Sequence, residues 1–207
     1  MRISDHPFIF CAEVGSNHAG SYDLAVEGIR EAARAGATAV KFQYFRAESL
    51  VAAPSKHPKT RYFAMPVGWI PKLRAEAEQH KLFFGLSVFG LELVSDVRDQ
   101  LDYVKIAAYD LTYHKLIAAC AGLGVSLVMS TAMGTMAEVE SALKAARAAP
   151  EVVLLHGVAC YPATFESQNL RAIPALYERF GCRVGISDHT VGYDAAMVAA
   201  VLDATWF

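Results

Sequence analysis

The sequence predicts an α/β protein of the TIM (β/α)8-barrel type, with seven βα units and the start of an eighth strand. Short apolar runs alternate with longer stretches of helical period along the 207 residues, which is typical of βα repeats. Each apolar run also ends in polar residues. A parallel barrel gathers the C-terminal ends of its strands on one rim, where its active site lies. The pattern therefore favours an enzyme whose site is distributed around a ring of strands.

Composition supports this fold and excludes several functions. Hydrophobic residues make up 54% and charged residues 19% of the chain, which suits strands buried on both faces of a sheet. We expect one domain over residues 1–207. No apolar run approaches the roughly 20 residues of a membrane span. The net charge of −2 gives no sign of a nucleic-acid or membrane partner. The four cysteines have no metal-ligand spacing, which indicates free thiols in a reducing cytoplasm.

The elements follow in order along the chain. The predicted strands are residues 8–14, 39–43, 82–88, 103–107, 126–130, 152–158 and 183–187. The predicted helices are residues 21–35, 67–80, 91–101, 113–123, 135–148, 169–180 and 193–203. Ser21 is placed to cap the first helix, whose inner stripe is Ala25, Ile29 and Ala32. Glycines 36, 124 and 181 fall just past helix ends, where a left-handed residue costs least.

Two segments stand apart from this repeat. The connection 44–66 is long and carries Arg46, Lys56, His57, Lys59 and Arg61, which favours a lid or substrate loop. Residues 205–207 begin what we predict to be the eighth strand, which a barrel needs to close its edges. We therefore expect this chain to be a truncated barrel.

Two lysines lie inside predicted strands. Lys41 and Gln43 point to one face of their strand, and Lys105 repeats the arrangement in another strand. A lysine in an apolar strand is costly unless its ammonium meets an anion or water. The structural alternative is an interior salt bridge from Lys41 to Glu13. Two such lysines on one rim, together with Ser130 and Ser187, favour a phosphate or carboxylate pocket.

Other rim residues leave alternatives open. Ser187, Asp188 and His189 end the seventh strand; an imidazole there binds a metal, transfers a proton or is only hydrogen-bonded. His156 is as well explained as a satisfied interior histidine. Glu13 and Asp110 are carboxylates suited to substrate hydroxyls or proton transfer. Tyr161 supplies an aromatic wall and a hydroxyl, or ordinary loop packing.

Taken together, the motifs resemble those of the sialic acid synthase family, which includes N-acetylneuraminate synthase and its legionaminate and pseudaminate relatives. The matching stretches occur in the family's order and cover nearly the whole chain. They are Ala12-Glu-Val-Gly-Ser-Asn-His-Ala-Gly20, Ala39-Val-Lys-Phe-Gln43, Val104-Lys-Ile106, Leu127-Val-Met-Ser-Thr-Ala-Met133, Leu154-Leu-His156 with Tyr161-Pro162, Asn169-Leu-Arg171, and Gly185-Ile-Ser-Asp-His-Thr-Val-Gly192.

The resemblance implies condensation of phosphoenolpyruvate with an N-acetylated amino sugar, which gives a nonulosonic acid and phosphate. It also implies a divalent metal, manganese with magnesium or cobalt as alternatives, that polarises the sugar aldehyde. Separately, apolar surface left exposed by the missing final βα unit favours a homodimer. The roles that it implies for residues of this chain are phosphoenolpyruvate binding by Lys41, Lys105, Ser130 and Ser187, metal binding by His189, and sugar contacts by Glu13, Gln43 and Tyr161. Asp110 keeps the acid of the family's pattern and is expected to contact the substrate. The expected catalytic residues are Glu13, His189 and Asp188, which adjoins the metal ligand.

The chain departs from the family's pattern at several positions. The resemblance places the family's second metal histidine beyond Phe207, and we expect this chain to lack the family's C-terminal antifreeze-like domain. Val88, Ala108 and Ala159 replace polar residues; each lost hydrogen bond to a charged ligand costs about 1.5–3 kcal/mol. The alternative is therefore a catalytically impaired relative that binds a phosphorylated or acidic sugar without turnover. A third interpretation is a Schiff-base aldolase that uses Lys105 or Lys41.

Overall fold

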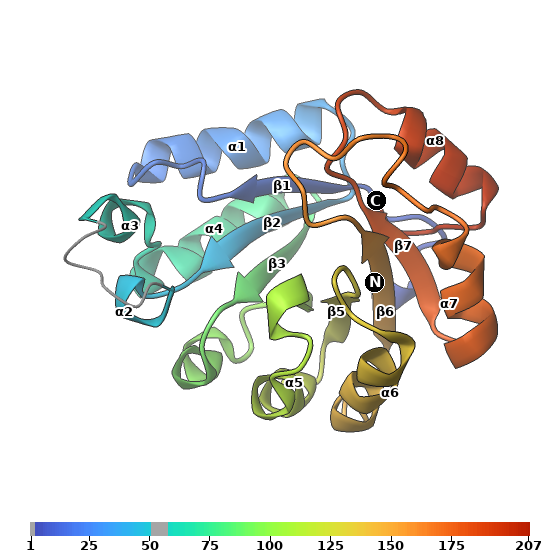
Figure 1. The fold of residues 1–207 in the computed structure, drawn as a ribbon. Helices are drawn as coiled ribbons and strands as arrows, with labels where there is room; N and C mark the ends of the chain where they lie inside the picture. The colour runs from blue at the N-terminus through green and yellow to red at the C-terminus, as the bar shows by residue number, and fades with distance from the viewer. Residues whose placement is uncertain (1–2, 51–57) are drawn as a thin grey trace. The chain divides into compact units, whose positions relative to one another are not determined.

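Seven β-strands alternate with helices along the described residues, 3–50 and 58–207, of this computed structural model (Figure 1). These residues form two compact units. The first, Phe10–Lys105, is called the N-terminal unit here, and the second, Ile106–Phe207 with Ile3–Ile9, the C-terminal unit. The order of the elements confirms the prediction of an α/β protein built from βα repeats.

The N-terminal unit contains a parallel sheet in chain order. Its strands are β1 (Cys11–Gly15), β2 (Ala39–Tyr44), β3 (Phe83–Val88) and β4 (Tyr103–Ile106, whose last residue belongs to the other unit). Register places Glu13 opposite Lys41, and Ser87 opposite both Gln43 and Lys105. Because side chains alternate between the two faces of a strand, these polar residues share one face. The other face is apolar, with Phe42 against Phe84.

Helices α1 (Tyr22–Arg34) and α4 (Ile70–Gln79) pack beside this sheet (Figure 1). The predicted cap of α1 is confirmed, because Ser21 Oγ accepts a hydrogen bond from Leu24 N at 3.3 Å. The predicted inner stripe of Ala25, Ile29 and Ala32 is buried. The first turn of the predicted helix 67–80 is instead a 3₁₀ turn, η3 (Val67–Trp69), because Pro71 stands in the first turn of α4, where proline is favoured.

The predicted α-helix 91–101 is wrong in type and length. This segment is a 3₁₀ helix, η4 (Leu91–Val97). Val94 and Val97 are both buried and lie three residues apart, a spacing that puts them on one face of a three-residue turn. The helix ends because Arg98 is extended and Asp99 has a φ of 62°.

The connection 44–66 is not an irregular loop throughout. It contains two short helices, α2 (Ala47–Leu50) and α3 (Pro58–Phe63). Proline at the first position of α3 suits a helix start. Tyr44 OH donates to Asp96 Oδ2 at 2.7 Å and Arg46 lies 3.6 Å from the same oxygen, which holds the beginning of the connection against η4. The predicted loop residues Lys56 and His57 lie outside the described residues, and the lid or substrate role stays a prediction.

The C-terminal unit also contains parallel strands in chain order, β5 (Ser126–Ser130), β6 (Val152–Gly157) and β7 (Arg183–Ser187). Its α-helices are α5 (His114–Ala121), α6 (Met136–Ala145), α7 (Ala172–Phe180) and α8 (Asp194–Val201). Thr135 and Glu138 form a capping box at α6. The glycines predicted just past helix ends, 36, 124 and 181, all have positive φ.

Residues 205–207 extend beside β7. Thr205 N donates to Val184 O at 2.9 Å, and Ile186 N donates to Trp206 O at 2.8 Å. On the other side, Ile9 N donates to Thr205 O and Phe207 N donates to Ile9 O. The predicted first strand, 8–14, is therefore split: Ile9 pairs with residues 205–207, and the strand that pairs with β2 begins at Cys11.

None of the helices within residues 3–50 and 58–207 has the length and apolar character that crossing a bilayer requires.

Candidate functional site

The N-terminal unit brings together Lys41, Glu13 and Ser87. Lys41 Nζ donates to Ser87 Oγ at 2.9 Å and forms an ion pair with Glu13 Oε2. Lys41 is buried, whereas the side chain of Glu13 is 52% exposed. The salt bridge that the structural alternative predicted is therefore present, but its carboxylate is the accessible partner. The Gln43 amide lies near the Glu13 carboxylate, since both border Gly15. A Cβ added at Gly15 would stand 3.1 Å from Glu13 Oε1 and 3.8 Å from the Gln43 amide.

Lys105 shares this face with Lys41 but has no such partner. Among the described residues its amine makes no hydrogen bond or short ion pair. Burial, with a smaller contribution from the Lys41 ammonium, lowers the pKa of Lys105 to about 8. Two amines on one face with only one half-exposed carboxylate near them form a site of excess positive charge that an anion would stabilise.

The C-terminal unit places His189 in a defined orientation. Its Nδ1 lies 2.6 Å from Val158 O. A carbonyl only accepts hydrogen bonds, so Nδ1 carries the hydrogen and Nε2 keeps a lone pair for a metal or a proton. The ring of Tyr161 lies 4.0 Å from the ring of His189, centroid to centroid. Ala163 N donates to His189 O at 2.8 Å, which ties the loops after β6 and β7 together.

The Asp188 carboxylate binds within its own loop. Its Oδ1 accepts hydrogen bonds from Thr190 N at 2.9 Å and Thr190 Oγ1 at 2.8 Å. This is an Asx-type turn, which fixes the residue after His189. The contact favours a structural part for Asp188, and its catalytic role stays a prediction.

Ser130 and Ser187 end β5 and β7 in the same unit. Within residues 3–50 and 58–207 neither hydroxyl makes a hydrogen bond, so both are available as donors to a ligand. Between these strands, His156 of β6 is buried, and its Nε2 lies 2.6 Å from Gln168 O. This contact is the one expected of a satisfied interior histidine.

Asp110 ends the 3₁₀ turn η5 (Ala108–Asp110) and has an unsatisfied carboxyl oxygen. Its Oδ2 is buried and has no hydrogen-bond partner among the described residues. Burial raises the pKa of Asp110 to about 6. A buried carboxyl oxygen without a donor is unusual in a folded protein and is often found at a site that binds a ligand.

The predicted site residues therefore fall into two groups, one in each unit. The lysine group contains Glu13, Lys41, Gln43 and Lys105. The imidazole group contains Asp110, Ser130, Tyr161, Ser187, Asp188 and His189. Sequence reasoning gave no ligand role to Ser87, which caps Lys41, and overlooked Tyr103. The available signal for Tyr103 was its position two residues before Lys105, which puts both side chains on one face.

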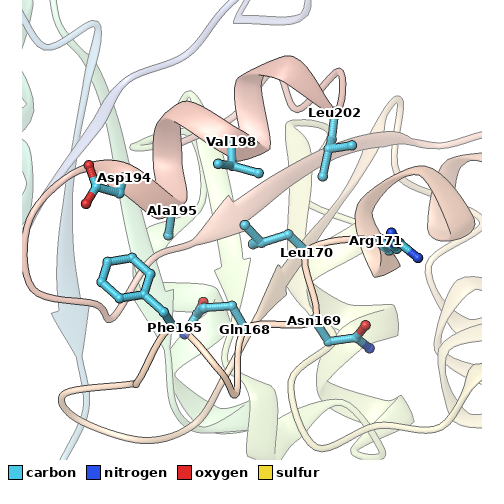
Figure 2. Close-up of a pocket in the computed structure, with 9 residues that line it drawn as sticks. All are labelled: Phe165, Gln168, Asn169, Leu170, Arg171, Asp194, Ala195, Val198 and Leu202. Atoms are coloured by element: carbon cyan, nitrogen blue, oxygen red, sulfur yellow. The ribbon is translucent and has the colours of Figure 1, made fainter.

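A pocket of about 520 Å³ in the C-terminal unit lies between α8 and the residues before α7 (Figure 2). Its wall is apolar at Leu170 and Val198, and it contains none of the predicted site residues. Among the described residues there is also no cluster of three histidine, cysteine or carboxylate side chains that would hold a metal. His189 is thus the single predicted ligand for which the geometry can be assessed.

Comparisons with known proteins agree with the motifs. The chain is 31% identical over 216 residues to the N,N'-diacetyllegionaminic acid synthase of Campylobacter jejuni, covering 95% of this chain and 65% of that protein. It is 33% identical to the spore coat polysaccharide biosynthesis protein SpsE of Bacillus subtilis, covering 95% of this chain and 57% of that protein. The chain spans about three fifths of the length of the curated relatives it matches.

A solved structure shows the same fold. The sialic acid synthetase of Leptospira borgpetersenii, in complex with citrate, superposes with a TM-score of 0.91 at 26% identity, covering 98% of this chain and 72% of that one. The α/β fold with parallel strands therefore matches sialic acid synthase structures, and the resemblance read from the motifs is confirmed. The NeuB family model matches residues 28–207, and the chain belongs to the NeuB family.

Proposed function

We propose that this protein condenses phosphoenolpyruvate with an N-acetylated amino sugar to give a nonulosonic acid and phosphate, with the help of a divalent metal. The observation that carries the proposal is the lysine group, in which Lys41 and Lys105 share one face of one sheet in a chain of the NeuB family. Several relatives are named legionaminic or pseudaminic acid synthases, which supports this reaction class.

The charges of the lysine group suit the proposed substrate. Phosphoenolpyruvate carries a phosphate and a carboxylate, and ammonium groups bind such anions as point charges. Lys41 pairs with Glu13, whose half-exposed carboxylate a ligand anion can displace, and Lys105 has no short ion pair. We assign phosphoenolpyruvate binding to both lysines, and sugar contacts to Glu13 and Gln43.

The imidazole group can supply hydrogen-bond donors to the substrates and a ligand to a metal. Ser130 and Ser187 offer hydroxyls to an anionic substrate, and Tyr161 and Asp110 offer polar contacts to a sugar. His189 would hold the metal through Nε2, because its Nδ1 is committed to Val158 O. A divalent ion, Mn²⁺ with Mg²⁺ or Co²⁺ as alternatives, supplies Lewis acidity to a substrate carbonyl when bound. Asp188 holds the loop on which His189 stands.

The experiment is phosphate release from phosphoenolpyruvate with N-acetylmannosamine and related amino sugars, with and without Mn²⁺. We expect release that depends on both substrates and on the metal, and its loss in Lys105→Met. As a control, Lys144→Met alters an exposed lysine paired with Glu140 on α6 and should release phosphate as the wild type does. A folded protein that releases no phosphate with any amino sugar would refute the proposal.

The resemblance to the family also supports a second candidate, a relative that binds without turnover. It implies polar residues where this chain has Val88, Ala108 and Ala159. Each loss would weaken contacts to a charged ligand by about 1.5–3 kcal/mol. Calorimetry distinguishes the two candidates, because saturable binding of phosphoenolpyruvate with no product after long incubation supports the second.

The lowered pKa of Lys105 also favours a Schiff-base aldolase, since a neutral amine is the nucleophile in that chemistry. Borohydride with pyruvate traps such an imine as a stable adduct of increased mass. An adduct at Lys105 would support the aldolase and count against anion binding by that residue.

We also propose that residues 205–207 open the eighth strand of a TIM barrel and that the protein is a homodimer. The hydrogen bonds to β7 on one side and Ile9 on the other support the strand. Exposed Val191, Met197 and Val201, around α8, support an apolar surface that a second copy would cover. Sedimentation equilibrium tests the dimer. A cytoplasmic location stays a prediction from the four free cysteines.

A further inference from the structure

Tyr103 lies on the same face of the N-terminal sheet as the two lysines. It begins β4 two residues before Lys105, and its side chain is fully buried. Its hydroxyl donates to Val40 O of β2 at 3.1 Å and lies 3.0 Å from Cys11 Sγ of β1. Either the thiol or the phenol can be the donor in the contact with Cys11, whose Sγ also lies 3.9 Å from Ala12 O. The side chain thus reaches from β4 across the sheet to β2 and β1.

The ring lies directly on the backbone of β3. A Cβ at Gly85 would stand 2.3 Å from the Tyr103 ring, so only glycine allows this approach. Register places Gly85 opposite both Lys41 and Tyr103, one step toward the N-terminal ends of the strands from the Ser87–Lys105 pair. By register the ring therefore lies level with Lys41, and one layer below Lys105 on the side away from the C-terminal ends of the strands.

We propose that Tyr103 is a positioning residue for the lysine group: its ring fills the sheet level that contains Lys41 and closes the layer beneath Lys105, so that the Lys105 ammonium meets an anion only from the C-terminal ends of the strands. This inference rests on the proposed function, because the anion it concerns is phosphoenolpyruvate. Tyr103 is not itself a catalytic residue, since it acts through the two lysines and touches no substrate.

The chemistry of this layer supports the inference. Burial raises the pKa of Cys11 to about 11, so the thiol stays neutral and offers the lysines no counter-charge. Burial is also the main cause of the lowered pKa of Lys105, which agrees with a water-free layer beneath it. The ring fills space that water would otherwise occupy. Water in that space would solvate the Lys105 ammonium from the side opposite the C-terminal ends of the strands.

The test compares Tyr103→Leu with Phe84→Leu. Phe84 is an equally buried aromatic residue next to Gly85 in β3, but its side chain points to the opposite face of the sheet. Both changes remove a ring from the same sheet, and only the first opens the layer beneath Lys105. Tyr103→Phe keeps the ring and removes the hydroxyl, which separates packing from the hydrogen bonds to Val40 and Cys11.

The readout is the pH dependence of acetylation at Lys105, followed by mass spectrometry of the peptide that contains it. We expect Tyr103→Leu to move the midpoint upward by about 1 pH unit or more and to raise the phosphoenolpyruvate KM about tenfold with a smaller change in kcat. Tyr103→Phe should move the midpoint less, and Phe84→Leu should leave it unchanged. If Tyr103→Leu does not fold, Tyr103→Met takes its place.

An unchanged midpoint in Tyr103→Leu, or an equal shift in Phe84→Leu, would overturn the inference and leave Tyr103 as ordinary packing. Acetylation needs no turnover, so this result is independent of whether the protein releases phosphate. A protein without synthase activity whose Lys105 midpoint still follows Tyr103 would refute the proposed function and retain the positioning of the lysine.

Discussion

Lys41 and Glu13 form an ion pair with unequal burial, since the side chain of Lys41 is 6% exposed and that of Glu13 is 52% exposed. Loss of the pair would cost the buried ammonium more free energy than the half-exposed carboxylate, because only the ammonium has lost its water. An anionic ligand that reaches Lys41 would therefore compete with Glu13 or replace it. The pair fits both a structural salt bridge and a binding lysine held ready by a displaceable partner.

Glu13→Gln separates these two interpretations. We expect the free energy of unfolding to fall by about 1–3 kcal/mol, because Lys41 keeps only Ser87 as a partner. If Lys41 binds anions, inorganic phosphate should then raise the melting temperature of Glu13→Gln more than that of the wild type, measured by thermal melts at constant ionic strength. Glu27→Gln, which removes a half-exposed carboxylate paired with exposed Arg34, is the control. Equal stabilisation of all three proteins would mean that the pair is only structural.

The lowered pKa of Lys105 predicts how binding and stability change with pH. Phosphoenolpyruvate should bind the protonated amine, so its affinity should fall about tenfold per pH unit above the pKa of about 8. The free energy of unfolding should change with pH in the opposite direction. The unfolded chain keeps the ordinary pKa of 10.5 and binds more protons than the folded chain above pH 8, so the free energy of unfolding should rise with pH between about 8 and 10.5.

Calorimetric titrations between pH 7 and 10 measure the binding, and urea unfolding over the same range measures the stability. Lys105→Met should remove both dependences, whereas Lys144→Met on the exposed surface of α6 should keep them. Persistence of the binding slope in Lys105→Met would assign it to another group.

Much of the fold could be predicted because local signals and tertiary packing agree. The cap at Ser21 and the stripe of Ala25, Ile29 and Ala32 specify α1 by themselves, and the structure has both. The failures occur where a pattern fits two structures. The spacing of Val94 and Val97 fits an α-helix and a 3₁₀ helix equally, and the chain adopts the second. The break between Ile9 and Cys11 depends on which strand each residue pairs with, which no local pattern contains.

The candidate site was partly predictable for a similar reason. Alternation along a strand is enough to put Lys41 beside Gln43 and Lys105 on an inner face. Which groups then contact each other depends on register between strands, so the hydrogen bond from Lys41 to Ser87 could not be derived. Tyr103 was overlooked because a tyrosine at the start of a strand is ordinary, and its significance comes from the glycine opposite it in β3.

Asp110 offers a test in the C-terminal unit. Burial raises its pKa to about 6, above the ordinary 3.8. The folded chain therefore binds more protons than the unfolded chain between these values, and the free energy of unfolding should fall as pH rises from about 4 to 6. Asp110→Asn should remove this dependence and stabilise the protein at pH 7 by about 1–3 kcal/mol. Urea unfolding at pH 4.5, 5.5 and 7 measures it. Asp194→Asn at the start of α8 is the control, and a pH dependence that persists in Asp110→Asn would contradict the assignment.

Gly157→Ala tests how closely the ends of β6 and β7 must approach. An added Cβ would stand 2.8 Å from Ser187 O and 3.2 Å from Ser187 Cβ. The nearest obstacle is backbone, so the strands must separate, and we expect a loss of about 1–3 kcal/mol in the free energy of unfolding. The displacement should also reach Ser187 and, two residues on, His189, and weaken Mn²⁺ binding measured by calorimetry. Gly68→Ala is the matched control, because nothing lies within 4 Å of its added Cβ. An equal loss of Mn²⁺ affinity in Gly157→Ala and Gly68→Ala would show that the contact between Gly157 and Ser187 does not position His189.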